Sequence, residues 1–373
     1  MKEVRGLYAS ALVFTDEAED YALAQIKQLC DQPAFQGGQI RVMPDVHPGK
    51  VGPIGFTATV GTAILPAVVG IDIGCGMTIA KLKKTKREFQ KVDAVIREGI
   101  PSGFQIRRTP HRFAEEFEFS RLRCGGSIRM DKAACSIGTL GGGNHFIELD
   151  EDGTGGLYAL VHSGSRHLGK EVAEYYMREG QKVLDGKGVH LPYELTYLEG
   201  DLMEDYLHDM RLVQEFAGLN RAAMLDELLR GMKWKAEDTW SSIHNYVDFD
   251  TELEGRILRK GAISAHQGER VIIPVNMRDG VILGIGKGNR EWNCSAPHGA
   301  GRIQNRETIR KSYTVSQFKK EMKGIYSTCI SAETLDEAPF AYRSLSCLQE
   351  AVKDTVDITE LLKPVYNYKA GGD

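Results

Sequence analysis

Histidine, cysteine and acidic side chains stand beside glycine-rich turns at several separate points of the chain, where they could bind metal ions or phosphate. One such turn, residues 70–76, places Asp72 and Cys75 three residues apart. A thiolate can bridge two metal ions, and a carboxylate beside it adds charge that favours a divalent cation. A buried structural cysteine next to a turn aspartate is the alternative interpretation, so this turn alone is a weak indication.

His145 follows three consecutive glycines, residues 141–143, at the point where a loop enters an expected strand. Histidine is the commonest metal ligand, and its neutral form is available at physiological pH. A lone histidine in such a place is more often a hydrogen-bonded packing residue. The small and polar groups around it, including Asn144 and Glu148, favour a functional site.

Residues 157–161 predict a strand that ends at His162, and a polar glycine turn then leads to a helix expected from Lys170. A strand, a glycine turn and a helix start together form an anion site, because backbone N–H groups and an arginine can bind phosphate. Capping of the helix by serine would explain Ser165 but not His162 and Arg166 together.

The segment around His298 is the most informative, because a histidine between proline and a Gly-x-Gly-Arg run is exposed and flanked by elements that bind phosphate. This setting suits a histidine that attacks phosphorus. His244, beside Asn245, is interpreted as structural when taken alone, and His47 could support a neighbouring ligand. The residues that flank His298 are Pro297, Gly299, Ala300, Gly301 and Arg302.

The remaining histidines and cysteines lack such settings, and we interpret them as surface or packing residues. Seven cysteines, an odd number scattered along the chain, do not form a disulfide framework, so we expect reduced thiols and a cytoplasmic protein. This interpretation is least secure for Cys294, because it lies near His298 in the sequence. The group comprises His111, His167, His190, His208, His266, Cys30, Cys124, Cys135, Cys294, Cys329 and Cys347.

The glycine content and the net charge of the chain limit how it could bind ligands. The 41 glycines among 373 residues exceed a usual share of about 7%, and they gather in the turns described above. A net charge of −4 gives no general attraction for nucleic acid, so RNA would need a local patch. One candidate patch, for which a solvated charged surface is the alternative, comprises Arg107, Arg108, His111, Arg112, Arg121, Arg123, Arg129 and Lys132.

The pattern of apolar residues predicts both helices and strands. Residues 16–29 and 199–230 have helical spacing, and the second stretch forms either one long helix or a helical pair. Residues 40–82 indicate short strands and tight loops, and residues 272–285 a hairpin around Asp279 and Gly280. No apolar stretch reaches the roughly 20 residues that a membrane helix requires. Without a linker or repeat, we expect a single domain over residues 1–373.

The order of these motifs resembles the signature series of the RtcB family of RNA-splicing and RNA-repair ligases, over residues 43–370. Six motifs in the right order are far more specific than any one of them. The motifs are Asp45-Val46-His47, Asp72 with Cys75-Gly76, Gly143-Asn144-His145-Phe146 with Glu148, His162-Ser163-Gly164-Ser165-Arg166, His244-Asn245, and His298-Gly299-Ala300-Gly301-Arg302.

The resemblance implies an α+β fold, a single domain with mixed sheets around a central metal-binding cleft and helices at the periphery. It implies two Mn²⁺ ions held by Asp72, Cys75, His145, His162 and His244, and His298 as the residue that accepts GMP from GTP. It also implies nucleotide contacts from Asn144, Glu148, Arg166, His298, Gly299, Ala300, Gly301, Arg302 and Lys369. By ligand type alone, the metal could equally be Zn²⁺ or Co²⁺.

The reaction implied by the resemblance joins broken RNA ends. GMP passes from His298 to an RNA 3′-phosphate, and a 5′-hydroxyl then attacks this activated end and releases GMP. An end with a 2′,3′-cyclic phosphate is first opened. Two alternatives are a metal-dependent RNA-end phosphoesterase that does not seal, and a non-catalytic RNA-end binder, against which the complete set of metal ligands argues.

The sequence departs from the family pattern at two places. His167 follows Arg166 where a typical member has glycine, close to where RNA or phosphate is expected. Residues 274–280 stand where many members have a Pro-Gly-Ser-Met-Gly loop near the nucleotide. Both departures leave the expected metal ligands and His298 in place, so they bear on substrate preference more than on reaction type.

Overall fold

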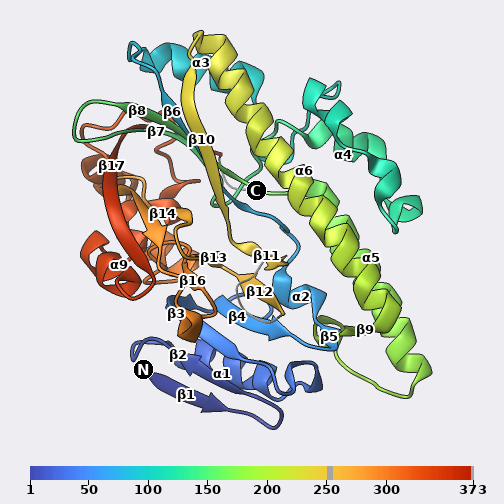
Figure 1. The fold of residues 1–373 in the computed structure, drawn as a ribbon. Helices are drawn as coiled ribbons and strands as arrows, with labels where there is room; N and C mark the ends of the chain where they lie inside the picture. Colours follow the sequence, from blue (N-terminus) through green and yellow to red (C-terminus); the bar gives the residue numbers. More distant parts are fainter. Residues whose placement is uncertain (250–254, 371–373) are drawn as a thin grey trace.

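Two large β-sheets with helices around them make up the computed structural model, which describes residues 1–249 and 255–370 (Figure 1). Among these residues the first sheet has the order β1 (Lys2–Arg5), β2 (Ser10–Val13), β3 (Ile40–His47), β4 (Ile54–Val60), β12 (Arg256–Lys260) and β11 (Asn245–Asp248). The second has the order β10 (Ala236–Ile243), β6 (Gly76–Leu82), β8 (Leu157–Ser163), β7 (Phe146–Glu151), β17 (Val356–Lys369), β15 (Gly280–Gly286) and β14 (Arg270–Asn276). The expected α+β class is confirmed.

Shorter ladders and helices complete the described part of the chain. Strand β13 (Ala262–Ser264) pairs with β16 (Ser295–Pro297), and β5 (Ala63–Ile64) pairs with β9 (Leu198–Glu199). The helices are α1 (Asp20–Cys30), α2 (Pro66–Val69), α3 (Phe89–Gly99), α4 (Met130–Ser136), α5 (Arg166–Gly186), α6 (Gly200–Met232), α7 (Arg306–Ser312), α8 (Val315–Glu321) and α9 (Leu345–Val352).

Helix α6 is one continuous helix of 33 residues, which decides between the two alternatives left by the sequence. It runs diagonally across the molecule beside α5 (Figure 1). Near its middle, the buried Arg221 donates from Nη1 to the carbonyl oxygens of Gly74 at 2.7 Å and Ser163 at 2.9 Å. The neighbouring Asn220 accepts from the backbone N–H of Gly138 at 2.8 Å. The helix therefore fixes three of the glycine turns that the sequence singled out.

The first sheet is packed on one side by α1. Ile26 and Leu29 of this helix are buried in one hydrophobic cluster with Val13, Val42 and Phe56 of the sheet. Burial of a side chain of this size stabilises the fold by about 1.5–3 kcal/mol. This packing holds β3 in place, and β3 carries Asp45 and His47 to the candidate site described below.

Element boundaries differ from prediction in a few places. The helix expected from residue 16 begins at Asp20. The apolar residues 67–69 form the short helix α2, because Pro66 occupies a first-turn position where its fixed φ favours helix. Helix α5 begins at Arg166 rather than Lys170. The hairpin of β14 and β15 is confirmed, with Asn276 paired to Gly280.

Candidate active site

The register of three neighbouring strands brings the predicted metal ligands together. In the β6–β8 pair Met77 lies opposite His162, and in the β7–β8 pair Phe146 lies opposite the same residue. Cys75 and His145 immediately precede these strands, so both lie beside His162. The backbone N–H of His244 donates to the carbonyl oxygen of Cys75 at 2.9 Å, which adds the third histidine to the group.

Ligand atoms of all five predicted residues converge. The Cys75 Sγ atom lies 3.4 Å from His145 Nε2 and 3.5 Å from His162 Nε2. His162 Nε2 is 3.1 Å from His244 Nε2, and His145 Nε2 is 3.1 Å from Asp72 Oδ2. Two groups result, Cys75 with His162 and His244, and Cys75 with Asp72 and His145, with all ligand atoms of each group within 4.8 Å. Cys75 is common to both, as a bridging thiolate would be.

The hydrogen bonds of the three imidazoles fit cation binding. His145 Nδ1 lies 2.8 Å from the carbonyl oxygen of Leu140, and His162 Nδ1 lies 3.2 Å from that of Asn144. His244 Nδ1 lies 3.3 Å from Oδ1 of Asn245. Because each oxygen accepts a hydrogen bond, each Nδ1 carries the proton and each Nε2 presents a lone pair to the centre. Converging lone pairs repel one another until a cation binds them.

Burial favours the neutral forms of the histidines and of the Cys75 thiol. It lowers the pKa of His162 well below its usual value and that of His244 to about 3, so both rings are neutral and able to coordinate. Burial also raises the pKa of the Cys75 thiol, and the Asp72 carboxylate adds to this effect. A bound divalent cation would offset this cost and stabilise the thiolate.

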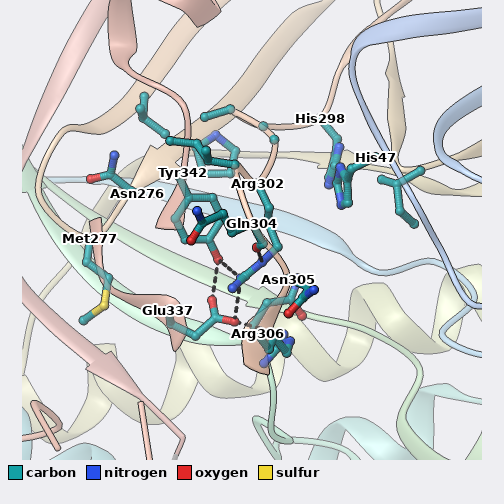
Figure 2. A pocket seen from close by; sticks show the side chains of 18 of the residues that line it. His47, Asn276, Met277, His298, Arg302, Gln304, Asn305, Arg306, Glu337 and Tyr342 are labelled. Carbon is teal, nitrogen blue, oxygen red and sulfur yellow. Dashed lines mark hydrogen bonds and ion pairs between the residues drawn. The ribbon is translucent and has the colours of Figure 1, made fainter. Parts of the chain in front are cut away.

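His298, the predicted nucleophile, follows β16 and lies next to this centre. Its ring centroid is 4.9 Å from that of His244, and its Nδ1 atom lies 2.8 Å from Oδ2 of the buried Asp45. His47, for which we expected a supporting role, lies beside His298 (Figure 2), and its Nδ1 atom is 2.9 Å from the carbonyl oxygen of Asp45. The Asp45 carboxylate holds the His298 proton on Nδ1, which leaves Nε2 with a free lone pair.

A cavity of about 980 Å³ opens from His298 and the two histidines His162 and His244. Residues 274–280, which differ from the family pattern, also reach the cavity. Asn276 and Met277 of this loop lie across the cavity from His298 (Figure 2). Of the residues predicted to bind nucleotide, those that line it are Asn144, Glu148, His298, Gly299, Ala300, Gly301, Arg302 and Lys369. Arg166 is not among them, because its side chain donates to the Gly103 carbonyl oxygen at 2.8 Å and to Thr139 Oγ1 at 3.2 Å.

A cluster centred on Glu337 forms part of the cavity wall (Figure 2), and the sequence analysis missed it. The Glu337 carboxylate lies 2.6 Å from Lys369 Nζ, 2.9 Å from Arg306 Nη2 and 3.3 Å from Arg302 Nη1. Burial opposes ionisation of Glu337, but these cations outweigh it and lower its pKa to about 2. The four-residue spacing of Arg302, Arg306 and Arg310 was the signal that could have located this wall.

Most cations of the candidate RNA patch have carboxylate partners. Arg112 and Arg129 pair with Asp226 and Glu171 at 2.6 Å and 2.5 Å. Further pairs are Arg107 with Glu227, Arg121 with Glu215, and Arg123 with Asp205. The acids lie on α5 and α6, far along the chain from the arginines. The patch is therefore largely balanced in charge, which favours the interpretation as a solvated charged surface.

A cavity that adjoins His298, arginine and lysine side chains and two clusters of metal-ligand side chains has the groups needed for metal-dependent phosphoryl transfer. The chain matches the family model "tRNA-splicing ligase RtcB" over residues 25–124 and 116–370. It is 31% identical over 362 residues to the RNA-splicing ligase RtcB of Escherichia coli K12, which covers 87% of this chain and 88% of that protein. The chain therefore belongs to the RtcB family.

More distant relatives match over similar lengths. The tRNA-splicing ligase RtcB of Thermococcus kodakarensis is 27% identical, with 93% of this chain and 90% of that protein covered. The RNA-splicing ligase RtcB2 of a second Escherichia coli strain is 28% identical, with 95% and 93% covered. Within the described residues, no helix is both long and apolar enough to cross a membrane.

Proposed function

We propose that this protein is a GTP- and Mn²⁺-dependent RNA ligase that joins 3′-phosphate or 2′,3′-cyclic phosphate ends to 5′-hydroxyl ends through a GMP adduct on His298. The names of its relatives support the RNA-ligase class. The observation that carries the proposal is the bond of 2.8 Å between His298 Nδ1 and Asp45, beside the converging metal ligands. A phosphoesterase that acts without His298 would not require a buried carboxylate to orient this histidine.

The first step transfers GMP to the protein. Nε2 of His298 attacks the α-phosphorus of GTP, an N–P bond forms, and the bond to pyrophosphate breaks. The ring becomes positively charged as the bond forms, and the buried Asp45 carboxylate at Nδ1 stabilises that charge. Asp45 thus both sets the tautomer of His298 and favours the adduct.

Arg302, Arg306 and Lys369 are suited to hold the nucleotide phosphates in the cavity. Glu337 and Asp336 neutralise only part of their charge, so the wall keeps an excess of positive charge. Because these side chains are already held in place, they can bind an anion without reorganising at the moment of reaction. Glu148, which is buried and lines the same cavity, would contact the nucleotide.

Two divalent cations would be held by Asp72, Cys75, His145, His162 and His244, of which Cys75 is common to both ligand groups. When bound, these cations neutralise the charge that develops on phosphoryl oxygens. The choice of Mn²⁺ rests on the family, since the donor set also suits Zn²⁺ and Co²⁺. All seven cysteines lie in the described residues and are unpaired, which supports a reducing compartment, and we propose the cytoplasm.

The later steps pass GMP to RNA. An oxygen of the RNA 3′-phosphate attacks the phosphorus of the adduct, and the N–P bond to His298 breaks. The 5′-hydroxyl of the second end then attacks the 3′-phosphorus, loses its proton, and GMP departs. A 2′,3′-cyclic end first takes up water to become a 3′-phosphate.

A sealing assay tests the proposal. RNA whose only labelled atom is the phosphorus of its 3′-phosphate is incubated with a 5′-hydroxyl RNA, GTP and Mn²⁺. We expect a longer product in which the label resists phosphatase, and no product when GTP or the metal is omitted. Release of the label without joining would instead establish the phosphoesterase alternative.

A further inference from the structure

Two buried carboxyl groups stand next to each other on β7, at the wall of the cavity. Glu148 and Asp150 are two residues apart on this strand, so their side chains point to the same face of the sheet. Glu148 lines the cavity, whereas Asp150 is fully buried and is not among the described residues that line it. A bound nucleotide can therefore touch Glu148, and Asp150 can act on the nucleotide only through Glu148.

Glu148 has partners that favour its ionised form. Its Oε2 atom accepts a hydrogen bond from Nδ2 of Asn367, which lies opposite it on β17. Burial raises the pKa of Glu148 to about 7, although Asn367, Asp150 and the charge of Lys369 all oppose this rise. The carboxylate form of Glu148 therefore depends on its hydrogen-bond donors, and the loss of one donor would favour the neutral form.

Asp150 lacks such partners. Neither of its carboxyl oxygens accepts a hydrogen bond from a donor in the described part of the chain. Its neighbour across the sheet is Tyr158 of β8, whose hydroxyl group donates to Glu360 instead, and Tyr158 and Leu160 belong to an apolar cluster on this face. A buried carboxylate without a donor or counter-charge is strongly disfavoured. Burial accordingly raises the pKa of Asp150 well above its usual value, and the charge of Glu148 raises it further.

The two carboxyl groups are close enough to share a hydrogen bond. Two ionised carboxylates cannot form one, because a carboxylate only accepts. A single proton between them supplies the donor and removes the repulsion of two like charges. This proton belongs on Asp150, because Asn367 and Lys369 stabilise a negative charge on Glu148 and no donor in the described residues does so for Asp150.

We propose that Asp150 is a positioning residue, which stays protonated and donates a hydrogen bond to Glu148, so that Glu148 meets the nucleotide as an oriented carboxylate. This inference rests on the proposed function, in which Glu148 contacts GTP. An oriented carboxylate only accepts hydrogen bonds, so it suits guanine, whose ring N–H and amino group are neighbouring donors. Adenine presents a lone pair at the same ring nitrogen, which a carboxylate repels. Asp150 thus contributes to the choice of base without touching the base.

Nucleotide affinity tests the positioning role. The measurement is the Kd of the α,β-methylene analogue of GTP, which cannot transfer GMP, in the presence of Mn²⁺. In Asp150→Leu, which removes the donor, Kd should rise about tenfold, the usual effect of losing a hydrogen bond to a charged group. Asp150→Asn retains an N–H donor and should keep the wild-type Kd, as should the control Glu151→Gln on the opposite face of β7. A wild-type Kd in Asp150→Leu, or an equal loss in Asp150→Asn, would overturn the proposal.

A base without the amino group provides the matching change in the nucleotide. The α,β-methylene analogue of inosine triphosphate should bind the wild-type protein more weakly than the guanosine analogue. In Asp150→Leu this difference should shrink, because the carboxylate that accepts from the amino group is no longer held. A general loss of packing would weaken both analogues equally. The same difference in the two proteins would therefore overturn the proposal.

Infrared spectroscopy reads the protonation state of Asp150 without nucleotide or RNA, which separates this inference from the proposed function. At neutral pH, the wild-type spectrum minus that of Asp150→Asn should contain the C=O stretching band of a protonated carboxyl group, and the band should shift in D₂O. The same subtraction with Glu151→Gln should contain carboxylate bands. Failure of ligation with the protonated band intact would count against the ligase alone. Carboxylate bands in the Asp150→Asn subtraction would overturn the inference.

Discussion

Asp45 and His298, 253 residues apart in the chain, meet through a hydrogen bond of 2.8 Å between Oδ2 and Nδ1. Asp45 is almost completely buried on β3, whereas His298 opens onto the cavity from the end of β16. The pair has the arrangement of an oriented nucleophile, in which a carboxylate fixes the ring and leaves the far nitrogen free.

Replacing this carboxylate should therefore slow GMP attachment. Asp45→Asn keeps the shape but removes the charge that stabilises the imidazolium, and we expect a rate roughly 10²–10⁴-fold lower. Metal content should be unchanged. The measurement is the single-turnover rate of labelled GMP incorporation at saturating GTP. A wild-type rate in this variant would show that Asp45 has no part in the reaction.

Cys75→Ser should lower metal occupancy, because a hydroxyl is a far poorer bridging ligand than a thiolate. Elemental analysis after dialysis against Mn²⁺ measures the bound metal per chain. Cys347→Ser, at an exposed cysteine, is the matched control and should retain the wild-type content. Equal metal content in Cys75→Ser and the control would argue against the shared ligand.

Glu337→Gln should reduce stability, because it leaves the buried Lys369 and the largely buried guanidinium group of Arg302 without their shared counter-charge. Removing one partner of such a cluster costs about 3 kcal/mol in the free energy of unfolding. Urea denaturation measures this quantity. Glu350→Gln, at an exposed carboxylate, should have no measurable effect. Equal stability of the two variants would be inconsistent with the cluster.

The stability should also depend on pH through His266. Its hydrogen bond to Asp248, 2.8 Å from Nε2, raises its pKa to about 10, with a contribution from Cys294. The usual value for an unfolded chain is about 6.5. A group whose pKa is raised in the folded state adds to the free energy of unfolding. This addition is complete at a pH below the pKa of the unfolded state, and it is lost as the pH rises towards the pKa of the folded state.

The free energy of unfolding of the wild-type protein should accordingly fall more between pH 6.5 and pH 10 than that of His266→Gln. His190→Gln, at an exposed histidine, should follow the wild-type curve. Parallel curves for wild-type protein and His266→Gln would exclude the charged pair with Asp248.

The sequence predicted the convergence of the metal ligands better than any other feature. Cys75, His145 and His162 each lie where a glycine turn meets a strand, and strand pairing brings such points together. The resemblance to the RtcB family, which the comparisons confirm, supplied His244, since its local pattern was interpreted as structural. The roles of these residues remain predictions.

Other features depend on contacts that local patterns do not encode. The acids of α5 and α6 that neutralise the arginine patch are distant in sequence, so the patch could not be judged from composition. Glu337 has no motif around it, and its role follows only from burial among three cations. The first helix begins at Asp20 rather than residue 16, and the Asp16 carboxylate pairs with the N-terminal ammonium group, a contact that helical spacing does not encode.

The location of the GMP adduct tests the account most directly. The protein is incubated with labelled GTP and Mn²⁺, digested, and mapped by mass spectrometry under conditions that preserve phosphoramidates. We predict one GMP on the peptide that contains His298, labile in acid and stable in base, absent in His298→Ala and present in His190→Ala. An adduct on another residue, or none in a protein that retains its bound metal, would contradict the account.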